Sequence, residues 1–139
     1  MIIATGARAM DMEVKMFFTF WGTAMLRDKN KTAKGKDFMS KMFGMMLPKG
    51  STKLKLSKMN MGGMGTDMMK NLMKKKHVAS LEELVETAGE LGVEINICQM
   101  SMDLMGFKKE EMIDYPYLKY VGVGTYLSDA DESRVQLFI

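Results

Sequence analysis

The chain has 139 residues, of which 47% are hydrophobic and 27% charged, and its formal net charge is +3 at pH 7. This length predicts one domain over residues 1–139, and the composition excludes a disordered or collagen-like polymer. No apolar run reaches the ~20 residues of a membrane-spanning helix, and Asp11 comes too early for a signal peptide. A single cysteine, Cys98, excludes an internal disulfide and predicts a reducing, cytoplasmic location.

The small net charge hides a strong polarity along the chain. Residues 26–76 contain fourteen Lys and Arg against three Asp, whereas residues 77–139 contain four basic and twelve acidic residues. A basic surface of this kind attracts an acidic protein or an anionic membrane. A solvated lysine-rich segment is the simpler interpretation. Nucleic-acid binding is not expected, because few aromatic residues lie among the lysines and no recognition motif is present.

The first half of the chain predicts a helix, a strand and a basic insertion. Residues 13–20 are rich in residues that favour strands, which predicts a buried strand. Residues 27–63 are basic, rich in Met and Gly, and are interpreted as an insertion into the domain. The other elements expected here are a helix over residues 1–10, a short helix from residue 21, a helix over 37–46, and at most a short edge strand over 51–57.

Methionine is concentrated before residue 74, with fifteen of the nineteen methionines at or before Met73. After Thr66, the residues Met69, Leu72 and Met73 recur at helical spacing, with lysines on the other faces. This pattern predicts an amphipathic helix. The glycines just before it predict a flexible loop.

The second half alternates helices and strands. Ser80 followed by Glu83 has the spacing of a capping box, and Gly92 ends the helix that this box begins. Strands are expected over 93–98 and 135–139, helices over 81–91, 99–106 and 125–130, and a further turn over 109–113. Together these elements predict an α/β fold whose mainly parallel sheet is covered on both faces. The chain opens in a helix and offers only three convincing strands, so a strand is expected to be missing or the sheet to be small.

Cys98 is the strongest candidate for chemistry. It ends a predicted strand where a helix begins, and ligands bind at this edge of open α/β sheets. The free N–H groups of a helix start stabilise a thiolate, provided that Asp103 faces solvent. An inert, buried cysteine is the alternative. The sequence Cys-Gln-Met-Ser lacks a second thiol, which excludes an intramolecular dithiol mechanism.

Other candidates have simpler structural interpretations. His77 lacks any partner in sequence and is expected to be a solvated loop residue. Three methionines of the glycine-rich loop, Met59, Met61 and Met64, have the soft sulfur ligands that Cu(I) prefers, although packing or oligomer contact is more common for such residues. The same loop lacks the Gly-Lys-Ser/Thr ending of a phosphate-binding loop.

Four segments of the chain resemble one known family. They are EVKMFFTFWGTAML, KLSKMNMGGMGTDMMKNLMKKK, INICQMSMDLMGFKKEEMID and VGVGTYLSDADESRVQLFI. In this order they are similar to the DsrE/DsrF-like family, and most to its subgroup called peroxiredoxin-like or DsrE-related. The resemblance implies a flavodoxin-like three-layer sandwich, assembly into dimers, trimers or hexamers, and a role in sulfur relay. It also implies a first strand before the initial helix, which this chain lacks.

The resemblance further implies that Cys98 carries sulfur as a persulfide, which it receives from a donor and passes to an acceptor thiol, in the manner of a sulfurtransferase. Backbone N–H groups of Gln99, Met100 and Ser101 would assist it, and no cofactor is required. We expect the pocket wall to come from the loop residues Met61, Gly62, Gly63, Met64 and Gly65, whose methionines would exclude water. The alternatives are a non-catalytic interaction module with a structural cysteine, or Cu(I) binding by the loop.

Overall fold

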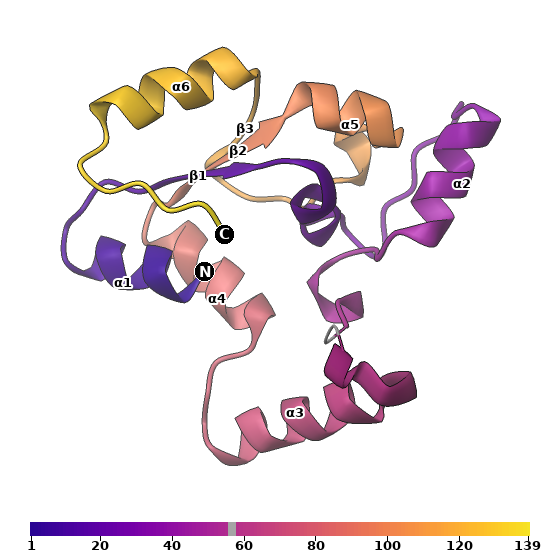
Figure 1. The fold of residues 1–139 in the computed structure, drawn as a ribbon, viewed down its shortest axis with the longest axis horizontal. Coiled ribbons are helices and arrows are strands. Elements are labelled where there is room, and N and C mark those ends of the chain that lie inside the picture. The colour runs from indigo at the N-terminus through magenta and orange to yellow at the C-terminus, as the bar shows by residue number, and fades with distance from the viewer. Residues whose placement is uncertain (56–57) are drawn as a thin grey trace.

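The computed structural model describes residues 1–55 and 58–139. At its centre is a three-stranded parallel sheet with the strand order β1-β2-β3 (Figure 1). Because the strands are parallel, their carboxyl ends meet at one edge of the sheet. The strands are β1 (Lys15–Phe18), β2 (Glu94–Cys98) and β3 (Leu118–Val121).

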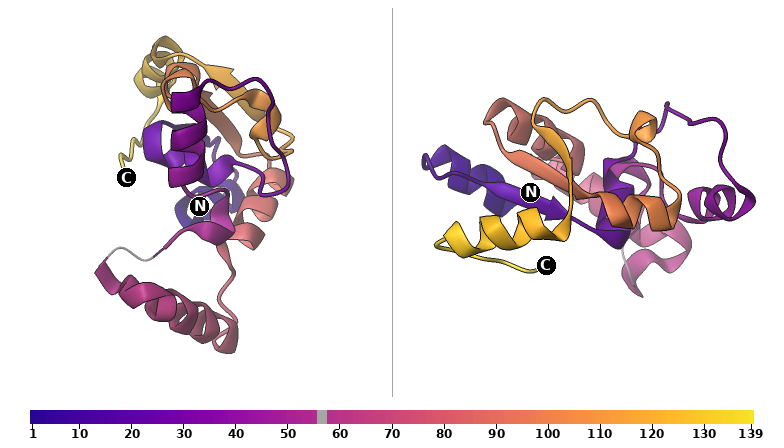
Figure 2. Two further views of the ribbon diagram at one scale, coloured as in Figure 1. Left: turned by 90° about the vertical axis from the view of Figure 1, so that its right-hand side faces the viewer. Right: turned by 90° about the horizontal axis from the view of Figure 1, so that it is seen from above.

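Helices pack on both faces of this sheet (Figures 1 and 2). The fold is therefore an α/β sandwich of the flavodoxin-like type, with a small sheet. None of the helices in the described ranges combines the length and hydrophobicity needed to cross a bilayer. The α-helices are α1 (Ile2–Ala9), α2 (Phe38–Met46), α3 (Met64–Lys75), α4 (Leu81–Glu90), α5 (Gln99–Met105) and α6 (Val123–Glu132), and the 3₁₀ helices are η1 (Phe20–Leu26), η2 (Ser51–Lys53), η3 (Lys58–Gly63) and η4 (Lys109–Glu111).

The hydrophobic core lies on one face of the sheet. Alternate strand residues such as Met16, Ile95 and Ile97 point into it, as the two-residue period of a strand requires. Helices α1 and α4 cover one end of this face through a small cluster of Ala4, Ala88 and Val93. The main cluster is formed by Ala24, Leu26, Ile95, Ile97, Met102, Met105, Phe107 and Met112.

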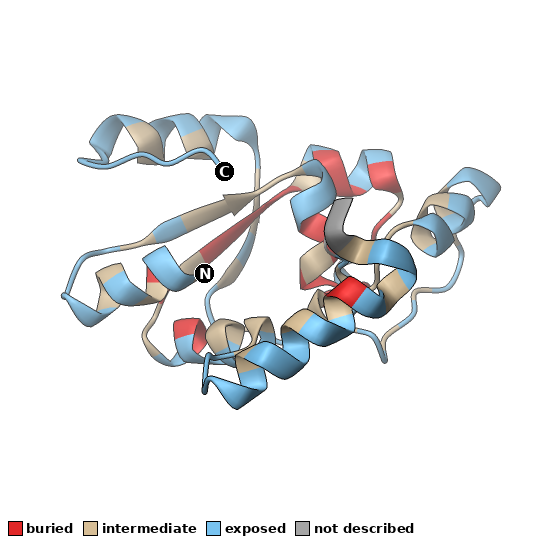
Figure 3. Cartoon of the chain, turned by 60° about the horizontal axis from the view of Figure 1, so that its bottom comes forward, coloured by how far each residue is buried: buried red, intermediate tan, exposed pale blue. Residues whose placement is uncertain are grey.

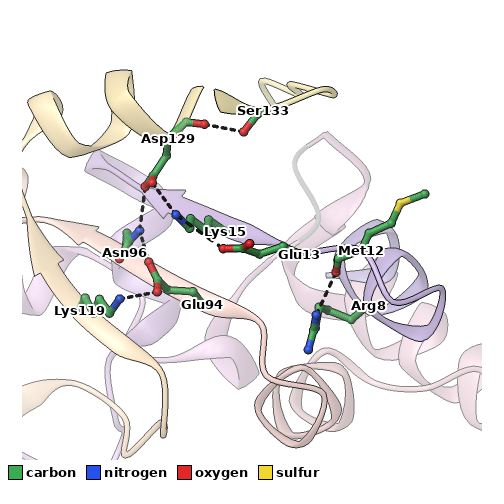
Figure 4. Close-up of polar contacts among 9 residues, drawn as sticks. All are labelled: Arg8, Met12, Glu13, Lys15, Glu94, Asn96, Lys119, Asp129 and Ser133. Atoms are coloured by element: carbon green, nitrogen blue, oxygen red, sulfur yellow. Dashed lines mark hydrogen bonds and ion pairs between the residues drawn. The ribbon is translucent and has the colours of Figure 1, made fainter. Parts of the chain in front are cut away.

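The opposite face is polar and is covered by α6 (Figure 4). Asn96 in the central strand is only 1% exposed, and its amide donates to Glu94 at 2.9 Å. Lys15 Nζ donates to Asp129 of α6 at 2.7 Å. Since α6 buries none of its own residues fully, polar contacts and one aromatic contact hold it on the sheet.

A buried ion cluster joins the predicted insertion to the segment between β2 and β3. Glu111 pairs with Lys36 and, at 3.5 Å, with Arg27, and the side chains of all three residues are at most 7% exposed. The Arg27 guanidinium also lies 4.5 Å from the centre of the Phe107 ring. Burial alone would raise the pKa of Glu111, but hydrogen bonds from Lys36 and from the Lys108 N–H, with the nearby cations, lower it below its usual range.

Most of the predicted elements are confirmed. The first helix, the strand at residues 13–20, the strand at 93–98 and the helix after it all form. Both hydrogen bonds of the capping box are present, from Glu83 N–H to Ser80 at 3.2 Å and from Ser80 N–H to Glu83 at 2.6 Å. As expected, α1 precedes every strand. The register shows in addition that β1 pairs directly with β2.

Two strand predictions are wrong, and one strand was missed. Residues 135–139 form no strand and are exposed. Ser51–Lys53 forms a 3₁₀ turn rather than an edge strand, and the last two residues of that prediction lie outside the described residues. The missed strand β3 has only four residues, Leu118–Val121, and a lysine in its middle hides its apolar character.

The helix α3 is confirmed, although it begins at Met64, two residues before the expected start. The loop before it is the 3₁₀ helix η3, in which Met61, Gly62 and Gly63 have positive φ angles. Two of these three are glycines, which adopt this conformation without strain. Figures 1 and 2 show α3 well below the sheet and α6, and Figure 3 shows most of its surface exposed.

Candidate functional site

Cys98 is the last residue of β2 and the N-cap residue of α5. The helix that follows is fixed to the core by Met102 and Met105, which are 0% and 4% exposed. In the sheet register, Cys98 lies opposite Val121, the last residue of β3. The thiol is therefore held at the carboxyl edge of the sheet by rigid elements.

Two hydroxyl groups lie next to this thiol. Thr19 follows the last residue of β1, and its Oγ1 lies 2.7 Å from the Oγ of Ser101. Ser101 is fully buried in the first turn of α5. This hydrogen bond links β1 to α5 across the end of the central strand, so both hydroxyls are held beside Cys98.

The surroundings favour the thiolate form of Cys98. Burial raises the pKa of the thiol, since it disfavours the charged form. Hydrogen bonding to the Ser101 hydroxyl and N–H, to the Thr19 hydroxyl and to the Met100 N–H acts in the opposite direction. The hydrogen bonds together outweigh burial, and the pKa of Cys98 lies below its usual value.

Cys98 is nevertheless sealed from solvent, with only 3% of its surface exposed. A cavity of about 530 Å³ lies beside α4, and a smaller one of about 260 Å³ lies beside Lys108. Neither of these cavities is lined by Cys98, Thr19 or Ser101. Any reaction at Cys98 therefore requires the thiol to become exposed.

The residues that follow Cys98 divide into an exposed and a buried set. Gln99 donates to Asp103 at 2.9 Å, and Asp103 is exposed, as expected. Met100 is 65% exposed, so its backbone contributes to the site while its side chain extends to the surface. Of the side chains of Gln99, Met100 and Ser101, that of Ser101 is the one that lowers the pKa of the thiol.

The structure does not bring the glycine-rich loop to Cys98. Met61 and Met64 are each 71% exposed, and Figure 1 draws η3 and α3 far below α5. Gly62, Gly63 and Gly65 belong to the same two elements. His77 is exposed on the segment that follows α3. Of the three methionines considered for Cu(I), the side chain of Met59 lies outside the described residues.

Sequence reasoning missed Thr19 as a site residue. Its signal was its position near the end of the strand predicted over residues 13–20, because residues at the ends of neighbouring parallel strands share one edge of the sheet. Recognising it required knowing that β1 is the immediate neighbour of β2, which only the register shows.

The fold and site define an α/β protein with a single thiol, of lowered pKa, at the carboxyl edge of a parallel sheet. Residues 1–138 match the profile of the DsrE/DsrF/DrsH-like family, and the chain belongs to this family. It is 49% identical over 138 residues to YrkE, an uncharacterized protein of Bacillus subtilis strain 168, covering 99% of this chain and 85% of YrkE. It is 39% identical over 145 residues to the sulfur carrier protein DsrE2 of Allochromatium vinosum, covering 99% of this chain and 86% of DsrE2.

Proposed function

We propose that this chain is a sulfur-relay protein that carries sulfur as a persulfide on Cys98 and passes it to an acceptor thiol. Family membership and the likeness to a DsrE2 sulfur carrier support a role in sulfur relay with partner proteins. The observation that carries the proposed mechanism is the hydrogen-bonded thiol at the sheet edge, with its lowered pKa.

The chemistry needs only one thiol in this chain. The Cys98 thiolate attacks the outer sulfur of a donor persulfide, the S–S bond of the donor breaks, and the donor leaves as a thiolate. An acceptor thiolate then attacks the outer sulfur on Cys98 and releases the Cys98 thiolate again. Each step exchanges one S–S bond for another, so no oxidant or reductant is consumed. The Ser101 and Thr19 hydroxyls stabilise Cys98 when it leaves as a thiolate.

Because Cys98 is buried, the partner proteins have a further role in this proposal, which is to expose the sulfur. A sealed persulfide is protected from water and from small thiols, whereas a donor or acceptor must open the site to reach the sulfur. The proposed pocket wall of Met61, Gly62, Gly63, Met64 and Gly65 requires that loop to come from another copy or to move. We propose a homo-oligomer that works in the cytoplasm, which agrees with the single free cysteine.

Mass spectrometry of the intact protein tests this proposal. After incubation with a persulfide donor, the wild-type protein should gain the mass of one sulfur atom, and a thiol reductant should remove it. Cys98→Ser should gain nothing, whereas Ser128→Ala, an exposed serine on α6, should load like the wild type. Persistent loading of Cys98→Ser would show that the sulfur is held elsewhere.

A second candidate function, an interaction module with a structural cysteine, is favoured by the 3% exposure of Cys98. The two candidates differ in thiol reactivity, since an inert cysteine reacts slowly and without a lowered pKa. Alkylation of the folded protein should therefore follow a pH profile shifted below that of a free thiol if Cys98 is the carrier. A profile like that of a free thiol would favour the interaction module.

A further inference from the structure

The helix α3 leaves its apolar side uncovered. Met64 and Met68 are each 71% exposed and Leu72 is 49% exposed, while Gly65 is the one buried residue of this helix. The three exposed residues follow one another at four-residue spacing, which places them along one face. An isolated helix of 12 residues is marginally stable in water, so α3 is expected to gain stability by burying this face.

Lysines lie at the C-terminal end of this apolar face, where Lys75 and Lys76 follow Leu72 at three- and four-residue spacing. Lys70 lies two residues after Met68 and therefore on another side of the helix. The ammonium group of Lys70 donates to the Thr52 carbonyl at 3.1 Å and forms no ion pair in the described ranges. Lys74, Lys75 and Lys76 are exposed and likewise lack an ion-pair partner among residues 1–55 and 58–139. A surface that covers α3 should therefore combine apolar side chains with carboxylates.

The cavity of about 530 Å³ beside α4 has this composition. Its rim carries Glu82, Glu86 and Glu90, which repeat at four-residue spacing along α4. None of these three carboxylates forms an ion pair within the described part of the chain, so their mutual repulsion is uncompensated. Its apolar lining is formed by Met25, Val85, Ile113, Tyr115 and Pro116. We call this cavity and its rim the acidic groove.

We propose that α3 of one chain docks in the acidic groove of a second copy of the same chain. The Met64, Met68 and Leu72 face covers the apolar lining, and Lys75 and Lys76 at the end of α3 lie against the glutamates of α4. Because each copy has both surfaces, two reciprocal contacts form a closed dimer with twofold symmetry.

Within one chain, α3 does not occupy the acidic groove. The helix ends in a local turn, in which Val78 N–H donates to the Met73 carbonyl at 2.9 Å and His77 has a φ of +54°. Near the middle of α3, Lys70 donates to the Thr52 carbonyl of η2, the element that also contributes Ser51 to the groove lining. No residue of α3 lines the acidic groove of its own chain.

Charge reversal with sedimentation equilibrium tests the dimer. Glu86→Lys/Glu90→Lys alters the groove, and Lys75→Glu/Lys76→Glu alters α3. Each variant alone should raise the dimer Kd by about tenfold or more at low salt, since attractive pairs become repulsive. An equimolar mixture should restore dimers to near the wild-type Kd, because one contact is then native and the other has both charges exchanged. Lys41→Glu on α2 and Glu132→Lys on α6, both exposed, are the controls.

Circular dichroism checks that each variant keeps its helix content, and Met68→Ser/Leu72→Ser should weaken the dimer without any change of charge. A wild-type chain that stays monomeric would overturn the proposal. A mixture of the two variants that stays dissociated would also overturn it, if the four substitutions compensate one another when they are combined in one chain. Monomers that bind vesicles of anionic phospholipid through α3 would also overturn it in favour of a membrane surface. Cys98→Ser should leave the dimer unchanged, so this inference and the proposed sulfur chemistry fail separately.

Discussion

Removal of the Ser101 hydroxyl should make the Cys98 thiolate harder to form. Ser101 is fully buried, and its hydroxyl is the strongest of the hydrogen-bonding groups that lower the pKa of this thiol. A hydrogen bond to a charged group contributes about 1.5–3 kcal/mol. Since about 1.4 kcal/mol corresponds to a factor of ten, Ser101→Ala should reduce the thiolate-to-thiol ratio about tenfold or more at a given pH.

The ultraviolet absorbance of the thiolate, followed in a pH titration of the folded protein, measures this effect. Cys98→Ser supplies the baseline, and Ser128→Ala is a matched control because it removes an exposed serine hydroxyl. The titration curve of Ser101→Ala should move to higher pH, and alkylation should slow below the midpoint. A curve that superimposes on the wild-type curve would refute the role assigned to Ser101.

The same substitution changes how stability depends on pH. The pKa of Cys98 is lowered in the folded state, so ionisation of the thiol contributes to the free energy of unfolding above the pKa of the unfolded chain. That contribution is lost as the pH falls through the lower, folded-state pKa. Ser101→Ala should raise the folded-state pKa of Cys98 toward the unfolded-state pKa, so that ionisation of the thiol adds less stability. It should also lower the free energy of unfolding by about 1 kcal/mol at all pH values, because the hydrogen bond with Thr19 is lost.

Three further predictions concern the fold and are measured by urea unfolding. Glu111→Gln leaves two buried cations without their carboxylate and should lower the free energy of unfolding by about 3–5 kcal/mol. The pKa of wild-type Glu111 is lowered in the folded state, so its contribution to stability is lost as the pH falls through that pKa. Gly106→Ala places a Cβ 2.1 Å from Ser40 at a φ of +65° and should lower the free energy of unfolding by more than about 1 kcal/mol. As a control, Gly124→Ala in α6 meets no atom within 4 Å and should raise the free energy of unfolding by about 0.5–1 kcal/mol. Ser80→Ala removes the capping box of α4 and should cost about 1 kcal/mol; an unchanged midpoint would contradict the role of this cap.

Local sequence patterns predicted the helices and two of the strands because their causes are local. The capping box depends on Ser80 and Glu83, which are three residues apart. Helix α5 begins after Cys98, where residues that favour a strand give way to residues that favour a helix. Cys98 was predicted as the reactive residue in the same way, since the end of a buried strand is a place where thiols can be activated. These features need no knowledge of distant contacts.

Strand pairing, by contrast, depends on partners far along the chain. The apolar residues 135–139 have strand character but lie exposed, whereas the less apolar Leu118–Val121 becomes β3 because it lies beside β2. The contact between Thr19 and Ser101 joins residues 82 positions apart, and local sequence patterns do not span such a separation. The sequence thus determined that Cys98 is the one candidate thiol. The tertiary structure determined which hydroxyls favour its ionisation and that it is buried, because both depend on packing between distant segments.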